Sequence, residues 1–415
     1  MSSPRAKFKL WLGRPRIYPA LFFCLLSCYL LGLILFLSAG KLREAAYYVE
    51  YARFLPIIGG LIVLSAVLLV LITLERPAAS GIGLLALLAL LAILFVGVFV
   101  HVSLWGRQNA QGEDIYFVFL EGRRLSQGEN PYERVLHGDM QTNLKYATYF
   151  PLAYLLSWAS HLAGLEGLTV WLGVWRIFFL ASMLWIAVLM YWSMARGTYT
   201  LFAIFAALFW LFNRWTLLVS DHYDIDFIPI LLLLLSLMFF PQHKILSFAL
   251  YGLSLGVKQF SIFLLPVYLI WAWQEGGQRP LKSVITGILS TAAVLVTVSL
   301  PFLIWNWKGF VLSILFSLTR LPNKYIDATS LDVKLGWQGV AGRLPLLLLI
   351  GLLYLLAWKV KPNRYLVAAL VFLAFVDFNS VLFPSYFVWA IPFALMAAYA
   401  LIEKSGKPVS QDLVD

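Results

Sequence analysis

The stretch that decides the fold is Gly81–Leu104, GIGLLALLALLAILFVGVFVHVSL, which contains no Asp, Glu, Lys or Arg. A helix of about 20 apolar residues crosses the hydrocarbon core of a bilayer, so this run predicts a membrane-spanning helix. It is followed by Gly112–Tyr132, GEDIYFVFLEGRRLSQGENPY, whose charged residues are Glu113, Asp114, Glu121, Arg123, Arg124 and Glu129. Together the two stretches predict a span that leads into a polar segment at the membrane surface.

The rest of the chain repeats this apolar pattern. Of 415 residues, 62% are hydrophobic and 12% are charged, whereas soluble globular chains are about half apolar. A membrane barrel would show short alternating segments instead of long apolar runs. The sequence therefore predicts an all-α, polytopic membrane protein with about 12 transmembrane helices. Besides 81–104, the expected spans are 18–39, 55–75, 168–194, 199–219, 225–240, 245–257, 260–274, 282–304, 344–360, 363–378 and 386–402.

The distribution of charge predicts the orientation. The N-terminal segment is basic, and basic segments stay in the cytoplasm. Twelve crossings return the C-terminus to the same side if the apolar run 148–163 lies along the outer surface as a helix and does not span. The two long loops, 105–167 and 305–343, then face outward, so we expect a multi-pass protein of the plasma or inner membrane with its active site outside. The excess of basic residues follows from this topology, and we expect no nucleic acid as a partner.

Three regions follow from this layout. Residues 1–80 form an N-terminal cytoplasmic segment and two extra transmembrane helices. Residues 81–274 form a core module that contains outer loop 105–167. Residues 275–415 form a C-terminal transmembrane module that contains outer loop 305–343.

The outer loops and two breaks in the apolar runs hold the candidate functional residues. Asp114 stands at the membrane surface, where a carboxylate avoids the cost of burial in hydrocarbon, and Glu113 is its neighbouring alternative. Lys258-Gln259 interrupts Tyr251–Trp271, YGLSLGVKQFSIFLLPVYLIW, and leaves two halves that are each short for a full crossing. Short broken helices meet at many membrane binding sites, so the lysine is a candidate anion ligand. The plainer interpretations are a solvated helix cap for Asp114 and a snorkelling lysine at a turn for Lys258.

Two further segments are polar at the outer side. In Ser220–Asp226, SDHYDID, the acids and His222 suit a divalent cation or sugar hydroxyls, or simply a charged turn. In loop 305–343, aromatic residues such as Trp337 suit sugar stacking or an interfacial belt. The arginines Arg176 and Arg343 lie in or beside spans, where they pair either with phosphate or with a structural acid. Glu121 and Glu129 are expected to be solvated neighbours of Arg123 and Arg124.

The order of these motifs resembles the GT-C superfamily of membrane glycosyltransferases, most of all glycosyltransferase family 87 and the mannosyltransferases that use polyprenyl-phosphate sugars. The resemblance rests on Asp114 and Tyr116, the Gly128–Tyr132 turn, Tyr149-Phe150-Pro151 in place of a Y-P-P motif, Gly252, Lys258-Gln259 and Leu264-Leu265-Pro266. It covers about residues 85–400. It implies a GT-C-like fold, a loop Asp as general base, and a lysine beside the lipid-phosphate pocket.

This resemblance implies an inverting hexosyltransferase that moves a sugar, expected to be mannose, from a polyprenyl phosphate to a lipid or glycan acceptor. The expected donor-phosphate ligands are Lys258, Gln259, Arg176, Arg343, Arg123, Arg124 and Lys145. The expected sugar and acceptor ligands are Tyr116, Tyr132, Tyr149, Asp221, Asp224, Trp337 and Gln338. No cofactor is expected, and a divalent cation stays possible. The alternatives are a lipid or sugar transporter or flippase, and an O-antigen-type ligase or polymerase that uses a diphosphate carrier.

Overall fold

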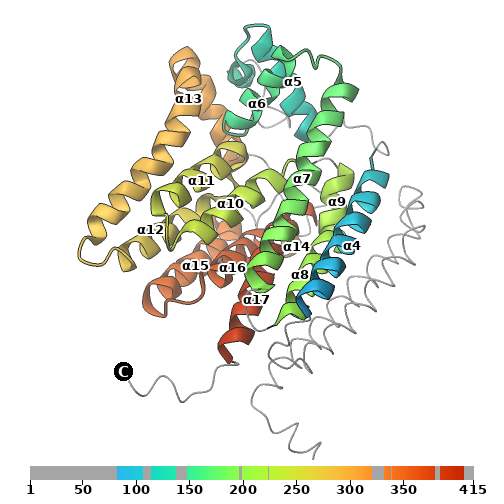
Figure 1. Ribbon diagram of the computed structural model, residues 1–415. Helices are drawn as coiled ribbons and strands as arrows, with labels where there is room; N and C mark the ends of the chain where they lie inside the picture. The colour runs from blue at the N-terminus through green and yellow to red at the C-terminus, as the bar shows by residue number, and fades with distance from the viewer. Residues whose placement is uncertain are drawn as a thin grey trace, which may run out of the picture. The chain divides into compact units, whose positions relative to one another are not determined.

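The computed structural model describes residues 82–105, 114–136, 147–195, 199–222, 224–319, 331–337, 339–378 and 384–405 (Figure 1). All regular structure in these residues is helical. The helices are α4 (Ile82–Ser103), α5 (Asp114–Ser126), the 3-10 helix η4 (Pro131–Leu136), α6 (Leu152–Leu162), α7 (Leu168–Ala195), α8 (Thr200–Phe212), α9 (Arg214–His222), α10 (Phe227–Phe239), α11 (Lys244–Val257), η5 (Gln259–Leu264), α12 (Leu265–Gln274), α13 (Pro280–Thr319), α14 (Leu331–Lys334), α15 (Gly339–Lys359), α16 (Arg364–Asp377), η7 (Pro384–Trp389) and α17 (Ile391–Ser405). The predicted all-α class is confirmed for this part of the chain, whereas the expected spans 18–39 and 55–75 lie outside it.

Several helices are long and apolar enough to cross a membrane. Within the described ranges there are 5 such helices, or 6 if the bent pair α8 and α9 counts as one span. They indicate a multi-pass integral membrane protein. The expected runs 225–240, 245–257 and 260–274 form α10, α11 and α12, of 13, 14 and 10 residues. At 1.5 Å per residue these helices are about 15–21 Å long, which is less than the ~30 Å of a hydrocarbon core. The full count of twelve crossings therefore stays a prediction.

The apolar run 148–163 does not form a helix of spanning length. Its helix α6 has 11 residues, which gives a length of about 16 Å. It packs beside α5, and Figure 1 shows the two helices side by side. The contact is very close at Gly122, where an added Cβ would lie 2.1 Å from the Ser157 hydroxyl oxygen and 2.9 Å from the Ser157 carbonyl carbon. Glycine is required here because α6 occupies the space of a side chain.

We predict that Gly122→Ala separates α5 from α6. Overpacking of this kind costs typically about 1–3 kcal/mol of unfolding free energy, and a fluorescence-monitored thermal melt in detergent measures the loss. Gly173→Ala in α7 is the matched control, because no atom lies within 4 Å of an added Cβ there. The double variant Gly122→Ala/Ser157→Gly removes the Ser157 side chain that the new methyl group would meet, and it should recover part of the stability. Equal melting temperatures for the two alanine variants would rule out this packing.

Part of the expected outer loop 305–343 is helical. Helix α13 runs on to Thr319 and leaves helical geometry inside its length only at Asn306, where φ is −157° and ψ is 88°. The Asn306 side chain accepts a hydrogen bond from the Gly309 backbone N–H at 3.0 Å and donates one to the Glu133 carboxylate at 3.3 Å. The first part of the expected outer loop 305–343 is therefore helical as far as residue 319. The asparagine caps a second helical segment, and that segment packs against η4.

Contacts divide the chain into two compact units. The described parts of the first lie within 82–102, 187–217 and 394–405, and those of the second within 103–186 and 218–393. In the first, the buried His101 ring is 2.8 Å from the Leu211 carbonyl oxygen. The second contains most of the candidate site residues. The division predicted from sequence, with boundaries at 80 and 274, consists of three consecutive regions. The two compact units are each assembled from separate segments of the chain, so they do not test that division, which stays a prediction.

Candidate functional site

Asp114 is the first residue of α5, where the exposed N–H groups of a helix favour a negative charge. Its side chain is partly buried. The hydroxyl of Tyr149 donates a hydrogen bond to the Asp114 Oδ2 atom. Residue 149 lies in the segment before α6, so the pairing of α5 with α6 brings this carboxylate and this phenol together.

Tyr149 is held by its backbone as well as by its side chain. Its carbonyl oxygen accepts a hydrogen bond from the Tyr132 hydroxyl at 2.8 Å, and its N–H donates to the Tyr154 hydroxyl at 3.2 Å. Burial, and then the nearby Asp114 carboxylate, raise the pKa of Tyr149 well above the ordinary value of a tyrosine. The phenol is therefore neutral and keeps its proton for donation.

Lys258 ends α11 with an extended backbone, as the break predicted from sequence requires. Its Nζ atom lies 2.9 Å and 3.1 Å from the two carboxylate oxygens of Asp226, the residue before α10. Asp226 also accepts a hydrogen bond from the Trp389 indole N–H at 2.7 Å. Lys258 is 5% exposed and Asp226 is 0% exposed, so this is a buried ion pair. The antiparallel packing of α10 and α11 places both residues at the same end of the pair.

Aromatic rings surround the lysine. Its ammonium lies 5.5 Å from the ring centres of Tyr149 and Tyr386 and 5.6 Å from that of Trp389. These distances are within the range of cation–π attraction. The neighbouring Gln259 donates a hydrogen bond to the Thr148 carbonyl oxygen at 2.6 Å. The break after α11 is therefore fastened to residues 148–149, the same segment that contacts Asp114.

The structure thus gathers Asp114, Tyr149, Lys258 and Gln259 into one group. Asp224 is buried and lies close enough for its charge to act on the Lys258 ammonium, as does the charge of Asp114. We call Asp114, Tyr149, Asp226, Lys258, Tyr386 and Trp389 the central group. Its chemistry combines a partly exposed carboxylate, a neutral phenol and an ammonium whose charge a second carboxylate balances.

Three members of the central group were missed in the sequence. Asp226 belongs to the SDHYDID segment, but Asp221 and Asp224 were preferred over it as ligands. Its signal was its position directly before the apolar run that forms α10. The sequence places Tyr386 and Trp389 in an expected span. Their signal is that they lie three residues apart in the helical turn that follows Pro384, so both are on one face of that turn.

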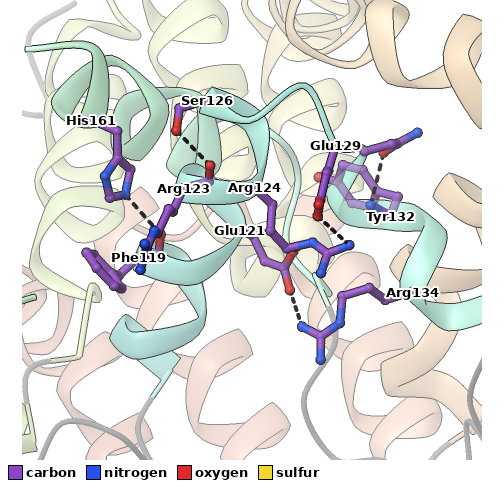
Figure 2. Close-up of polar contacts among 10 residues, drawn as sticks. Phe119, Glu121, Arg123, Arg124, Ser126, Glu129, Tyr132, Arg134 and His161 are labelled. Carbon is purple, nitrogen blue, oxygen red and sulfur yellow. Dashed lines mark hydrogen bonds and ion pairs between the residues drawn. The ribbon is translucent and has the colours of Figure 1, made fainter. Parts of the chain in front are cut away.

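Glu121 corrects an expectation. It was expected to be solvated, but it is 0% exposed and pairs with Arg134, while Arg124 Nε lies 3.4 Å from its other oxygen (Figure 2). Burial raises the pKa of Glu121, and Arg134 acts in the opposite direction. The pairing of α5 with η4 encloses the carboxylate, which a reading of α5 alone does not show. Glu129 is exposed, as expected, and pairs with Arg124 at 3.0 Å.

The other predicted ligands have contacts of their own. Tyr116 stacks on Phe119, with ring centres 6.4 Å apart. Tyr132 is fully buried, and its ring packs edge-on against Phe302 and Phe310.

The remaining ligand predictions are placed as follows. Arg123 is exposed on α5, Asp221 is buried in the last turn of α9, the Arg176 guanidinium lies 5.8 Å from the Trp105 ring centre, Arg343 is exposed on α15, and Trp337 is 42% exposed. Glu113, Lys145 and Gln338 lie outside the described residues.

The described residues contain no group of three or more His, Cys, Asp or Glu side chains that could hold a metal ion. Fold and central group together define a multi-pass α-helical membrane protein with a buried site of mixed charge. No protein-family model, curated protein or solved structure matches the chain.

Proposed function

We propose that this protein is an inverting membrane glycosyltransferase, in which Asp114 acts as general base on the acceptor and Lys258 binds the phosphate of a polyprenyl-phosphate hexose. Mannose is the proposed sugar, and a lipid or glycan is the proposed acceptor. The observation that supports this best is that Asp114 and Lys258, far apart in sequence, both contact the side chain of Tyr149. We further propose twelve spans, both chain ends in the cytoplasm, and the central group at the outer face of the plasma or inner membrane.

The proposed reaction needs one base. The acceptor hydroxyl oxygen attacks the anomeric carbon, its proton passes to the Asp114 carboxylate, and the bond from the anomeric carbon to the phosphate oxygen breaks. The electron pair leaves with the polyprenyl phosphate. This leaving group is a stable anion, because its conjugate acid has a low pKa, and it needs no protonation. Positive charge near the departing phosphate stabilises the transition state instead.

Lys258 has three N–H donors, and the Asp226 carboxylate lies within reach of two of them. A phosphate that binds here therefore shares the ammonium with Asp226. The pair holds the lysine in place, but it also lowers the net positive charge that a donor phosphate meets. Further cations are needed for the phosphate, and Arg176, Arg343, Arg123, Arg124 and Lys145 stay the candidates. In this proposal Tyr132 packs the loop and does not bind sugar, because its ring is enclosed.

A transporter or flippase is the second candidate function, and the buried Lys258–Asp226 pair is the observation that favours it, since paired charges within membrane helices often line ion pathways. Contacts around the start of α11 and the end of α12 favour the enzyme. There the Lys244 ammonium donates to the Glu275 carbonyl oxygen at 2.7 Å, Glu275 pairs with Arg364, and Gln274 donates to the Trp358 carbonyl oxygen at 2.9 Å. A carrier has to open both ends of its pathway, and these contacts tie one end together.

Purified protein in liposomes tests the proposal. Vesicles receive polyprenyl-monophosphate mannose, or the corresponding diphosphate carrier, with candidate acceptors, and mannosylated product is measured. Product from the monophosphate that depends on Asp114 supports the glycosyltransferase. Product from the diphosphate alone supports a ligase or polymerase. Movement of labelled lipid or sugar across the vesicle membrane without product, at the same rate in an Asp114 variant, supports the transporter.

A further inference from the structure

We infer that Tyr149 is the positioning residue of Asp114, and that its hydroxyl holds the carboxylate in place and keeps it ionised. This inference rests on the proposed function. It replaces the sequence-based assignment of Tyr149 to sugar binding. The reason is that the hydroxyl of Tyr149 is already directed at the Asp114 Oδ2 atom and its ring lies beside the Lys258 ammonium.

The backbone at Tyr149 is fixed by hydrogen bonds on both sides. Its carbonyl oxygen and its N–H are both bonded to tyrosine hydroxyls, those of Tyr132 and Tyr154. Gln259 binds the carbonyl oxygen of the preceding residue, Thr148. The side chain itself is held by its hydrogen bond to Asp114 and by the Lys258 ammonium beside its ring. It is suited to hold another group in place.

The hydroxyls that position Tyr149 are themselves fixed. Tyr132 belongs to η4 and is buried against α13, where an added Cβ on Gly309 would lie 2.7 Å from the Tyr132 carbonyl oxygen. Glu121 and Arg134 connect η4 to α5. Figure 2 shows the Glu121–Arg134 ion pair between the two helices. The chain of contacts therefore begins and ends on α5, at Glu121 and at Asp114.

The charge state of Asp114 is linked to this hydrogen bond, which the Tyr149 hydroxyl donates to the carboxylate Oδ2 atom. A hydrogen bond donated to an ionised carboxylate favours the ionised form. Lys258, Tyr154 and Tyr386 also lie close enough for the charge of Asp114 to act on them. Of these, Lys258 also favours the ionised form.

Tyr149→Phe tests the inference because it keeps the ring beside Lys258 and removes only the hydroxyl. We expect kcat to fall roughly 10- to 100-fold, the size of a hydrogen bond to a charged group, with an unchanged KM for the donor. We expect the acid limb of the pH–rate profile to move up by about one pH unit, because Asp114 then binds a proton more readily. Tyr251→Phe is the matched control. It removes a buried hydroxyl that donates to the Ser261 carbonyl oxygen at 2.9 Å, and it should leave the pH profile unchanged.

A second measurement does not need activity. Difference infrared spectroscopy follows the protonation of Asp114, whose band is identified by its loss in Asp114→Asn. The band should titrate at higher pH in Tyr149→Phe, and at lower pH when Tyr149 is replaced by a fluorinated tyrosine, whose hydroxyl is a stronger donor. This analogue keeps the size of the side chain and covers the case in which the phenylalanine variant does not fold.

The outcomes separate the inference from the proposed function. An Asp114 band that titrates at the same pH in all three proteins overturns the role of Tyr149, even if Asp114→Asn is inactive. Full activity of Asp114→Asn overturns the proposed function, and the infrared titration still decides whether Tyr149 controls the carboxylate. A donor KM that rises while kcat and the pH profile stay constant shows that Tyr149 binds substrate and does not position Asp114.

Discussion

Replacing Asp114 by asparagine is expected to lower the rate of sugar transfer by about 10²- to 10⁴-fold, the usual contribution of a general base. Asparagine has the same size, and its amide oxygen still accepts the Tyr149 hydrogen bond, so the loop should keep its structure. It cannot take the proton of the acceptor hydroxyl. Initial rates in liposomes under donor saturation measure the loss, which should appear in kcat and leave the donor KM nearly unchanged.

Glu129→Gln is the matched control for this variant. Glu129 lies in the same outer segment, its side chain is 51% exposed, and its contact is an ion pair with Arg124. Its loss should change the rate by no more than about fivefold, because exposed ion pairs contribute about 0–1 kcal/mol and about 1.4 kcal/mol is tenfold in rate. If Asp114→Asn transfers sugar at the wild-type rate and is produced in normal amounts, Asp114 is not the base.

Asp226→Asn is expected to destabilise the protein by about 3–5 kcal/mol, because it leaves the buried Lys258 ammonium without its counter-charge. The asparagine oxygen can still accept the Trp389 hydrogen bond, so the change isolates the charge. Lys258→Met should cost a similar amount by leaving the Asp226 carboxylate unpaired. The double variant Lys258→Met/Asp226→Leu should recover most of the stability, because removing both charges also removes the cost of burying them. Denaturant unfolding followed by tryptophan fluorescence in detergent measures all three.

The Glu275–Arg364 pair is the comparison. Both of its side chains are partly exposed, at 34% and 26%, so Glu275→Gln should cost no more than about 1 kcal/mol. Equal losses for Glu275→Gln and Asp226→Asn would show that the Lys258–Asp226 pair is not buried in the folded protein. A double variant less stable than either single variant would show that the pair itself stabilises the fold.

The positions of the helices could be predicted because the length of an apolar run is a local property. The runs 81–104, 168–194 and 344–360 appear as α4, α7 and α15, each within a few residues of its expected limits. The break at Lys258 was also visible, since a charge inside an apolar stretch is costly unless the helix ends there. The helix at residues 305–319 could not be located from the sequence, because the continuation of α13 depends on Asn306 and on its contact with η4.

The sequence by itself determined that this is an α-helical membrane protein and that Asp114 and Lys258 are unusual residues in their apolar surroundings. Tertiary structure decided which residues they meet. Three acids in SDHYDID are chemically alike, and the packing of α10 against α11 selects Asp226 as the partner of Lys258. The pairing of α5 with α6 brings Tyr149 to Asp114, and η4 buries Glu121. These choices depend on contacts between segments far apart in the chain, and residue type alone does not specify such contacts.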